Sequence, residues 1–177
     1  MITAEEFAAR WIHYGELVKF DEQQINDYSI SKNTKDFLLV SGLPEAAAPF
    51  VAFCVPEDKH EISVDEKSIK SAYMQIGFTS HGSPICINET NENIVYLDHE
   101  NNNQAIFINS SLAQFMESLL EYADFIEKIK KQNGRKAFLE RNATRETLEY
   151  ICHQLESIDC NALSYGNFWC EEMSHWQ

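Results

Sequence analysis

The segment from residue 74 to residue 122 constrains the fold of this chain more than any other segment. Short apolar runs alternate with polar turns, and the last run leads directly into a long helical pattern. The runs are residues 76–78, 84–87, 94–97 and 105–108. Runs of this length, bounded by Gly, Pro, Asn and Ser, are typical of antiparallel strands joined by hairpins. The order predicts a β-meander with a packing helix, and it favours a surface that binds over a pocket that reacts.

The helix that follows the meander has the clearest periodicity in the chain. Its apolar residues recur at steps of three and four, so they share one face. These residues are Leu112, Phe115, Met116, Leu119, Ala123, Ile126 and Ile129. Ser110 or Ser111 is a suitable N-cap, and Asn133-Gly134 is a suitable end.

Other helices and strands are predicted on both sides of this segment. Thr3 and Glu6 have capping-box spacing, which predicts a helix that ends near Gly15. Further helices are predicted from Ser31 or Asn33 to Gly42, and from Thr144 onward. Residues 17–20 and 50–53 are predicted as strands. Residues 21–27 are predicted as a loop, and residues 57–70 as a charged loop with a weak strand. Residues 168–176 are predicted as an aromatic tail that folds back on the body. Gly77, inside a predicted strand, indicates a bulge or a close backbone approach.

These elements together predict an α+β fold. We expect a largely antiparallel sheet, a meander of about four to six strands, with helices packed on one side and at the ends. A chain of 177 residues without an evident linker is expected to form a single domain over residues 1–177.

The charge balance narrows the choice of partners. The chain has 28 Asp and Glu against 14 Lys and Arg, which gives a net charge of −14. Such a charge repels phosphate backbones, so nucleic acid is not expected as a partner. The same charge would attract a basic protein and raise the rate at which the two proteins meet. The alternative is that the charge only keeps the protein soluble.

The compartment expected from the sequence is the cytoplasm. No apolar run approaches the roughly 20 residues of a membrane helix, and the first residues do not form a signal peptide, so no membrane is expected as a partner. The five cysteines form no Cys-x-x-Cys pair, as is usual for reduced thiols.

Catalytic and metal-binding patterns are weak throughout the sequence. Potential metal ligands are His81, Asp98, His99, Glu100, Cys152, His153 and Cys160, but no His-Glu-x-x-His motif places two of them on one helix face. Ser80-His81-Gly82-Ser83 brings a histidine near two serines, although a hairpin turn explains the same residues. The six glycines do not form a phosphate-binding loop. We therefore expect no enzyme, no metal and no cofactor.

Acidic residues gather in three segments that the meander would present on loops. Loop tips on a rigid sheet commonly carry recognition residues, although a plain solvated acidic face has the same composition. The candidate partner-binding residues are Glu57, Asp58, Glu61, Asp65 and Glu66 in the first segment, Glu89 and Glu92 in the second, and Asp98 and Glu100 in the third.

Several short motifs also resemble one protein family. They are Gly42-Leu43-Pro44 before Ala48-Pro49-Phe50, Ile76-Gly77, Pro84-Ile85-Cys86-Ile87, and the strand-to-helix junction at residues 107–115. Their order and spacing resemble the SUKH superfamily, most closely its fourth subfamily, over residues 37–122, with a weaker similarity at residues 167–169. The superfamily contains bacterial toxin-immunity proteins and fungal regulators of cell-wall synthesis.

The resemblance implies a sheet with helices on one side and at one end, and it implies a role. We expect an immunity protein that binds and neutralises a cognate polymorphic toxin, either a nuclease or a nucleic-acid deaminase, by protein–protein interaction. A non-enzymatic regulatory or scaffold module like the cell-wall regulators is the alternative. A small enzyme or ligand-binding protein is a third reading, which would need a deep pocket with convergent polar groups. The oligomeric state is left open, because an exposed strand edge can pair with many partners.

Overall fold

The computed structural model describes residues 1–55 and 73–176. Its centre is an antiparallel sheet in which each strand pairs with the next along the chain, in the order β3-β4-β5-β6-β7-β8. The strands are β3 (Ala46–Ala47), β4 (Val51–Phe53), β5 (Tyr73–Thr79), β6 (Pro84–Asn88), β7 (Ile94–Asp98) and β8 (Gln104–Asn109). The predicted meander is therefore confirmed, as is the α+β class. A separate ribbon pairs β1 (Leu17–Val18) with β2 (Leu43–Pro44).

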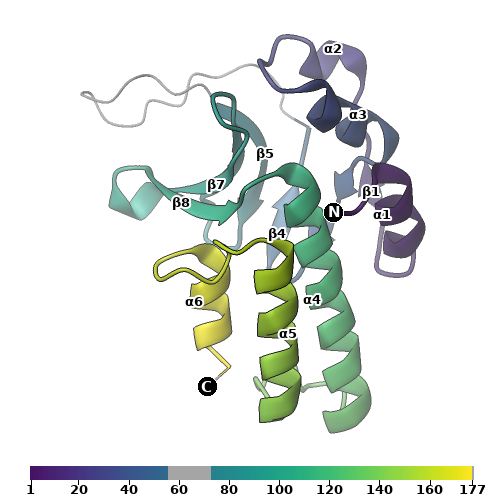
Figure 1. Cartoon of the computed structure of the whole chain (residues 1–177), viewed down its shortest axis with the longest axis vertical. Coiled ribbons are helices and arrows are strands. Elements are labelled where there is room, and N and C mark those ends of the chain that lie inside the picture. Colours follow the sequence, from purple (N-terminus) through teal and green to yellow (C-terminus); the bar gives the residue numbers. More distant parts are fainter. Residues whose placement is uncertain (56–72, 177) are drawn as a thin grey trace.

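Helices cover one side of this sheet and one of its ends. The long helix α4 (Leu112–Asn133), α5 (Arg145–Ile158) and α6 (Phe168–Ser174) run roughly side by side below the sheet in Figure 1, while the N-terminal helices lie beyond α4. Those are α1 (Ala4–Trp11), α2 (Glu22–Ile25) and α3 (Lys32–Val40). No helix in the described parts of the chain is long and apolar enough to cross a membrane.

Local capping decides where most helices begin. Thr3 and Glu6 form the predicted capping box of α1, and Ser31, Ser111 and Thr144 cap α3, α4 and α5 through hydrogen bonds to backbone N–H groups. Helix α1 ends at Trp11, and a turn separates it from Gly15.

One sequence expectation needs correction, and another is confirmed with an addition. Residues 21–27 were expected to be a loop, but Asp21 and Gln24 form a capping box that begins the short helix α2. A polar stretch of this length carries too few apolar residues for a periodic signal, so only the cap could have revealed it. The aromatic tail folds back on the body as predicted, with Trp169 and Trp176 buried, and part of it forms a helix, α6. The charged loop expected at residues 57–70 lies outside the described residues.

The main core is an apolar cluster that runs from Ile2 to Trp176, and a smaller separate cluster joins Tyr73, Cys86, Val95 and Leu97 of β5, β6 and β7. The main cluster includes the predicted face of α4, where Phe115, Met116, Leu119 and Ile129 have no exposed surface. Burial of this kind contributes roughly 1.5–3 kcal/mol to the stability of the fold for each large side chain. Helix α4 is therefore the main element that holds the N-terminal and C-terminal helices together.

Gly77 allows β4 and β5 to approach closely. The register between β5 and β6 shifts between Gln75 and Gly77. A Cβ atom at position 77 would lie 2.3 Å from the Ala52 carbonyl oxygen. Both the bulge and the close approach predicted for this glycine are therefore present.

We predict that Gly77→Ala lowers the free energy of unfolding by about 2–3 kcal/mol, because the clash is with backbone that cannot rotate away. Gly15→Ala is the matched control, since its Cβ would meet nothing nearer than 4.0 Å and its φ is not positive. Urea denaturation followed by circular dichroism measures both. Equal stabilities for the two variants would show that the β4–β5 approach is not tight.

Candidate functional site

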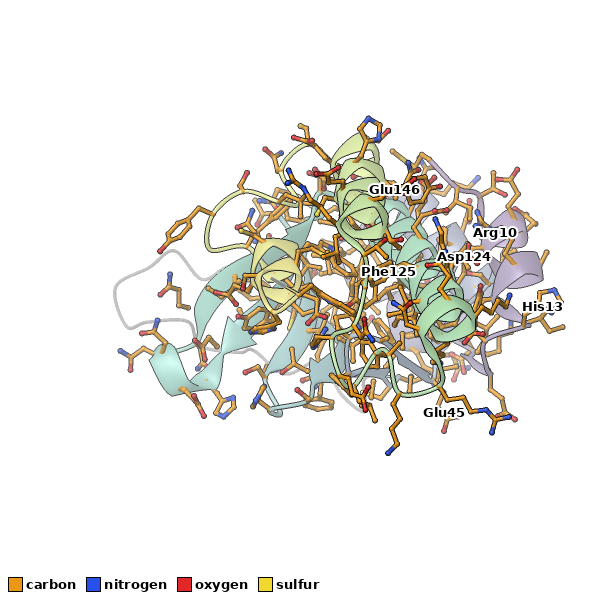
Figure 2. All side chains as sticks on the ribbon, turned by 90° about the horizontal axis from the view of Figure 1, so that it is seen from below. Arg10, His13, Glu45, Asp124, Phe125 and Glu146 are labelled. Carbon is orange, nitrogen blue, oxygen red and sulfur yellow. The ribbon has the colours of Figure 1, made fainter. Side chains whose placement is uncertain are left out.

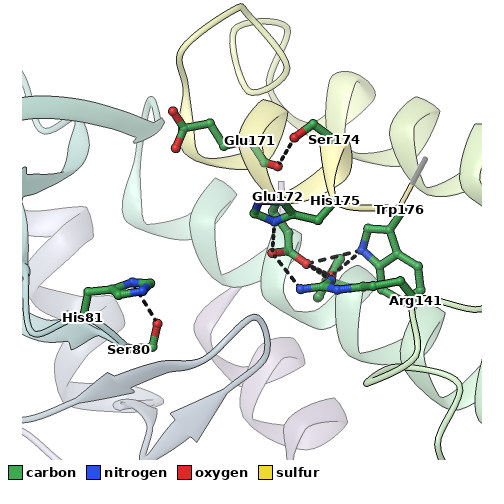
Figure 3. Close-up of polar contacts among 9 residues, drawn as sticks. Ser80, His81, Arg141, Glu171, Glu172, Ser174, His175 and Trp176 are labelled. Carbon is green, nitrogen blue, oxygen red and sulfur yellow. Dashed lines mark hydrogen bonds and ion pairs between the residues drawn. The ribbon is translucent and has the colours of Figure 1, made fainter.

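A groove opens where the sheet meets the C-terminal helix. It has a volume of about 530 Å³ and lies between the β5–β6 turn, the end of β7 and α6. Figure 3 shows the turn with Ser80 and His81 on one side and α6 with Glu171, Glu172 and His175 on the other. We refer to it as the acidic groove.

Carboxylates and aromatic rings share the walls of the acidic groove. Asp98 lies at the end of β7, Glu100 follows in a 3-10 turn (His99–Asn101), and Glu171 comes from α6. Phe50 and Tyr96 also line it, and Phe50 is 51% exposed.

The Tyr96 hydroxyl lies near two of these carboxylates, Asp98 and Glu171. Burial, together with the nearby Glu171 and Asp98 carboxylates, raises the pKa of Tyr96 to about 12. The Tyr96 ring also packs edge-on against Phe168, with ring centroids 6.2 Å apart. Asp98 and Glu171 therefore face one hydroxyl from two different elements, which makes this wall a concentrated source of negative potential.

The histidines and serines of the acidic groove contact one another in two pairs. Ser83 Oγ lies 2.8 Å from His99 Nδ1, but Ser83 is only 4% exposed, so its hydroxyl supports the turn. Ser80 Oγ contacts Nδ1 of the adjacent His81 at 3.2 Å (Figure 3). Within residues 1–55 and 73–176, no group of three His, Cys, Asp or Glu side chains could hold a metal ion.

A buried ionic cluster forms the back of the acidic groove and fixes α6. Glu172 is 8% exposed and accepts hydrogen bonds from Tyr122, Arg141 and Trp176 (Figure 3). Trp176 Nε1 also donates to the Tyr122 hydroxyl at 3.1 Å. Burial, followed by the charge of Glu172, raises the pKa of Tyr122, so this hydroxyl stays protonated and donates.

A second polar network fixes the loop that leads to α6. Asp159, 3% exposed, accepts hydrogen bonds from Ser110 N at 2.6 Å and Asn109 Nδ2 at 3.4 Å. Asn109 Oδ1 in turn accepts from Trp169 Nε1 at 2.9 Å. The end of β8 thus holds both the end of α5 and the start of α6.

The structure separates the predicted acidic segments. Glu92 precedes β7 and Asp98 ends it, so these two carboxylates lie at opposite ends of the strand. Asp98 and Glu100 line the acidic groove, and the structure adds Glu171 to them. Glu57, Asp58, Glu61, Asp65 and Glu66 lie outside the described residues.

The carboxylates at the tip of the β6–β7 hairpin accept hydrogen bonds from another segment of the same chain. Glu89 accepts a hydrogen bond from Ser29 N at 2.6 Å, and Glu92 accepts bonds from Ser31 N at 2.7 Å and Thr34 Oγ1 at 2.5 Å. Burial alone would raise the pKa of Glu92, but the hydrogen bonds from Thr34 and Ser31 outweigh it and lower the pKa. Glu92 therefore stabilises the start of α3.

Sequence reasoning missed the contributions of Phe50, Phe168 and Glu171. The weak family similarity at residues 167–169 was the one signal that pointed to the start of α6. Nothing local in the sequence indicates that this segment returns to the end of β7, because that contact depends on the networks around Asp159 and Glu172.

The fold and the acidic groove define an α+β protein whose surface suits the binding of cationic side chains, since carboxylates form ion pairs and exposed rings accept cations over their faces. The chain belongs to the SUKH-4 immunity protein family, whose model matches residues 3–176. This match extends the resemblance noted at residues 37–122 over nearly the whole chain. Comparisons with curated proteins and with solved structures gave no match.

We predict that Glu172→Gln lowers the free energy of unfolding by about 2–3 kcal/mol, because it leaves the partly buried Arg141 guanidinium without its counter-charge. The matched control is Glu149→Gln, which breaks an exposed ion pair with Arg145 and should cost under about 0.5 kcal/mol. Chemical denaturation of both variants provides the measurement. A cost for Glu172→Gln no larger than that of the control would contradict the structural role of the cluster.

Proposed function

We propose that this protein is an immunity protein that binds and neutralises a cognate toxin, either a nuclease or a nucleic-acid deaminase. It acts in the cytoplasm as a single SUKH-like domain over residues 1–177, and it blocks the toxin by binding, without catalysis of its own. Membership of the SUKH-4 immunity protein family supports the toxin as partner. The apolar core that runs from Ile2 to Trp176 supports a single domain.

The acidic groove is the observation that carries the mode of binding. A toxin that acts on nucleic acid needs Arg or Lys side chains to hold phosphates. Carboxylates that meet those side chains occupy the same positions as phosphates do, so the toxin cannot hold its substrate. The rings of Phe50, Tyr96 and Phe168 add surface over which an arginine can stack.

We propose that contact with the toxin centres on Asp98, Glu100 and Glu171. Glu89 and Glu92 contribute to the negative field of the molecule, but their carboxylates already accept hydrogen bonds from the segment that leads into α3. Contact by Glu57, Asp58, Glu61, Asp65 and Glu66 remains a prediction from the sequence.

The experiment tests the domains encoded by the genes adjacent to this one as candidate toxins. Asp98→Asn, Glu100→Gln and Glu171→Gln together should weaken binding at least about tenfold, or 1.4 kcal/mol, through loss of partly desolvated ion pairs. Rescue of cells that express the toxin should fall in parallel, and the association rate of the wild-type protein should decrease as salt rises.

The matched control carries Glu140→Gln, Glu149→Gln and Glu156→Gln, which remove the same charge from exposed positions outside the acidic groove. Equal binding by the two triple variants would show that the acidic groove does not contact the toxin and that only the overall charge of the protein affects binding. Failure of the wild-type protein both to bind and to rescue would overturn the immunity role and favour the regulatory module.

A further inference from the structure

A second groove lies on another part of the surface, between the end of α1, β3 and the C-terminal half of α4. Its volume is about 740 Å³, and Trp11, Ile126 and the alanines at residues 46–48 line it. Figure 2 shows this side, with Arg10 near Asp124 and His13 projecting from the end of α1. We refer to it as the edge groove, because β3 is the first strand of the sheet.

The backbone of β3 presents an unfilled pairing position to the edge groove. Ala46 is opposite Ala52, and the flanking Phe53 N donates to Glu45 O at 3.1 Å. In an antiparallel pair with this pattern, the residue between two hydrogen-bonded pairs directs its own N–H and C=O away from the partner strand. The Ala46 groups therefore point away from β4, and within the described residues β3 has no second neighbour in the sheet.

A buried donor without an acceptor lies in the wall of the same groove. Trp11 is 2% exposed, and its Nε1 has no hydrogen-bond partner in the described residues. The other two tryptophans differ, because Trp169 donates to Asn109 and Trp176 donates to Tyr122. Buried donors are rarely left unpaired in native structures, so the Trp11 indole is a suitable reporter of a change in the wall of the groove.

The rim of the edge groove is basic although the chain is strongly acidic. Lys128, Lys130 and Lys131 line it. The two acids that also line it have partners already: Asp124 accepts from Arg10 at 2.9 Å, and Glu127 pairs with Lys130 at 3.0 Å. Lys128, which lies over the Tyr150 ring, and Lys131 thus leave a local excess of positive charge.

We propose that the edge groove binds an extended acidic peptide segment of a partner protein. The segment lies along β3 as an added strand, exchanges hydrogen bonds with Ala46, and places carboxylates on Lys128 and Lys131. An apolar side chain of the segment packs on Ala47 and Ile126, beside Trp11. Short exposed strand edges commonly recruit peptides in this way, with side-chain pockets that set the specificity.

This site is separate from the acidic groove and takes partners of the opposite charge. The toxin proposed above would use its basic surface at the acidic groove. The acidic segment belongs to a protein other than the toxin, so the proposal does not depend on the immunity role.

The test selects peptides of about ten residues, longer than an average strand, from a displayed random library on the full-length protein. We expect the selected peptides to alternate acidic and apolar residues. A synthetic copy should shift the Trp11 indole proton in the nitrogen-15 NMR spectrum, assigned with Trp11→Phe, and leave those of Trp169 and Trp176 in place. N-methylation of alternate peptide bonds should abolish binding and leave the protein unaltered.

Lys128→Glu with Lys131→Glu should weaken the peptide at least about tenfold, through loss and reversal of two ion pairs. The matched control, Lys32→Glu with Arg135→Glu, makes the same charge change at exposed positions outside the edge groove and should bind as the wild type does. The proposal is overturned if no peptide is enriched, if enriched peptides lack acidic residues, or if the two double variants bind equally.

Discussion

The buried carboxylate of Glu172 is the interaction on which the C-terminal part of this structure depends. It joins three elements, because Tyr122 comes from α4, Arg141 from the connection to α5, and Trp176 from beyond α6. A buried charge is costly unless it is paired and hydrogen-bonded, so the carboxylate permits few other placements of α6. That placement brings Glu171 and Phe168 to the end of β7. The cluster therefore supports the acidic groove from behind, together with the hydrogen bond from Trp169 to Asn109 at the start of α6.

The distribution of charge gives the molecule two different surfaces. The acidic groove gathers carboxylates and aromatic rings, while the edge groove gathers lysines beside an open strand edge. Some of the other acids are engaged within the chain: Glu92 accepts hydrogen bonds at the start of α3, and Asp124 holds α1 through Arg10 and Tyr14. The net charge of −14 is thus a poor guide to any one surface, and contact geometry decides which carboxylates can meet a partner.

The sequence predicted the elements that local chemistry controls. Hydrophobic runs and turns located the meander, the Thr3 capping box located α1, and Gly77 marked the close strand approach. It predicted only part of the candidate site, because Asp98 and Glu100 lie at or just after the end of a strand, whereas Glu171 reaches them through contacts between residues 49–60 apart in the chain. Periodicity and motifs describe neighbours in sequence. They do not describe a loop carboxylate that turns back to cap a helix, as Glu92 does.

Hydrogen exchange with the toxin domain bound is the most direct test of the central claim, that the acidic groove is the surface that binds the toxin. Backbone amides that lose access to solvent in a complex exchange more slowly, so the comparison of free and bound protein maps the contact. The account predicts that protection on binding concentrates at residues 96–101 and 168–175. Protection confined to the hairpin tip at residues 88–93, or to the helices α1–α3, would contradict it.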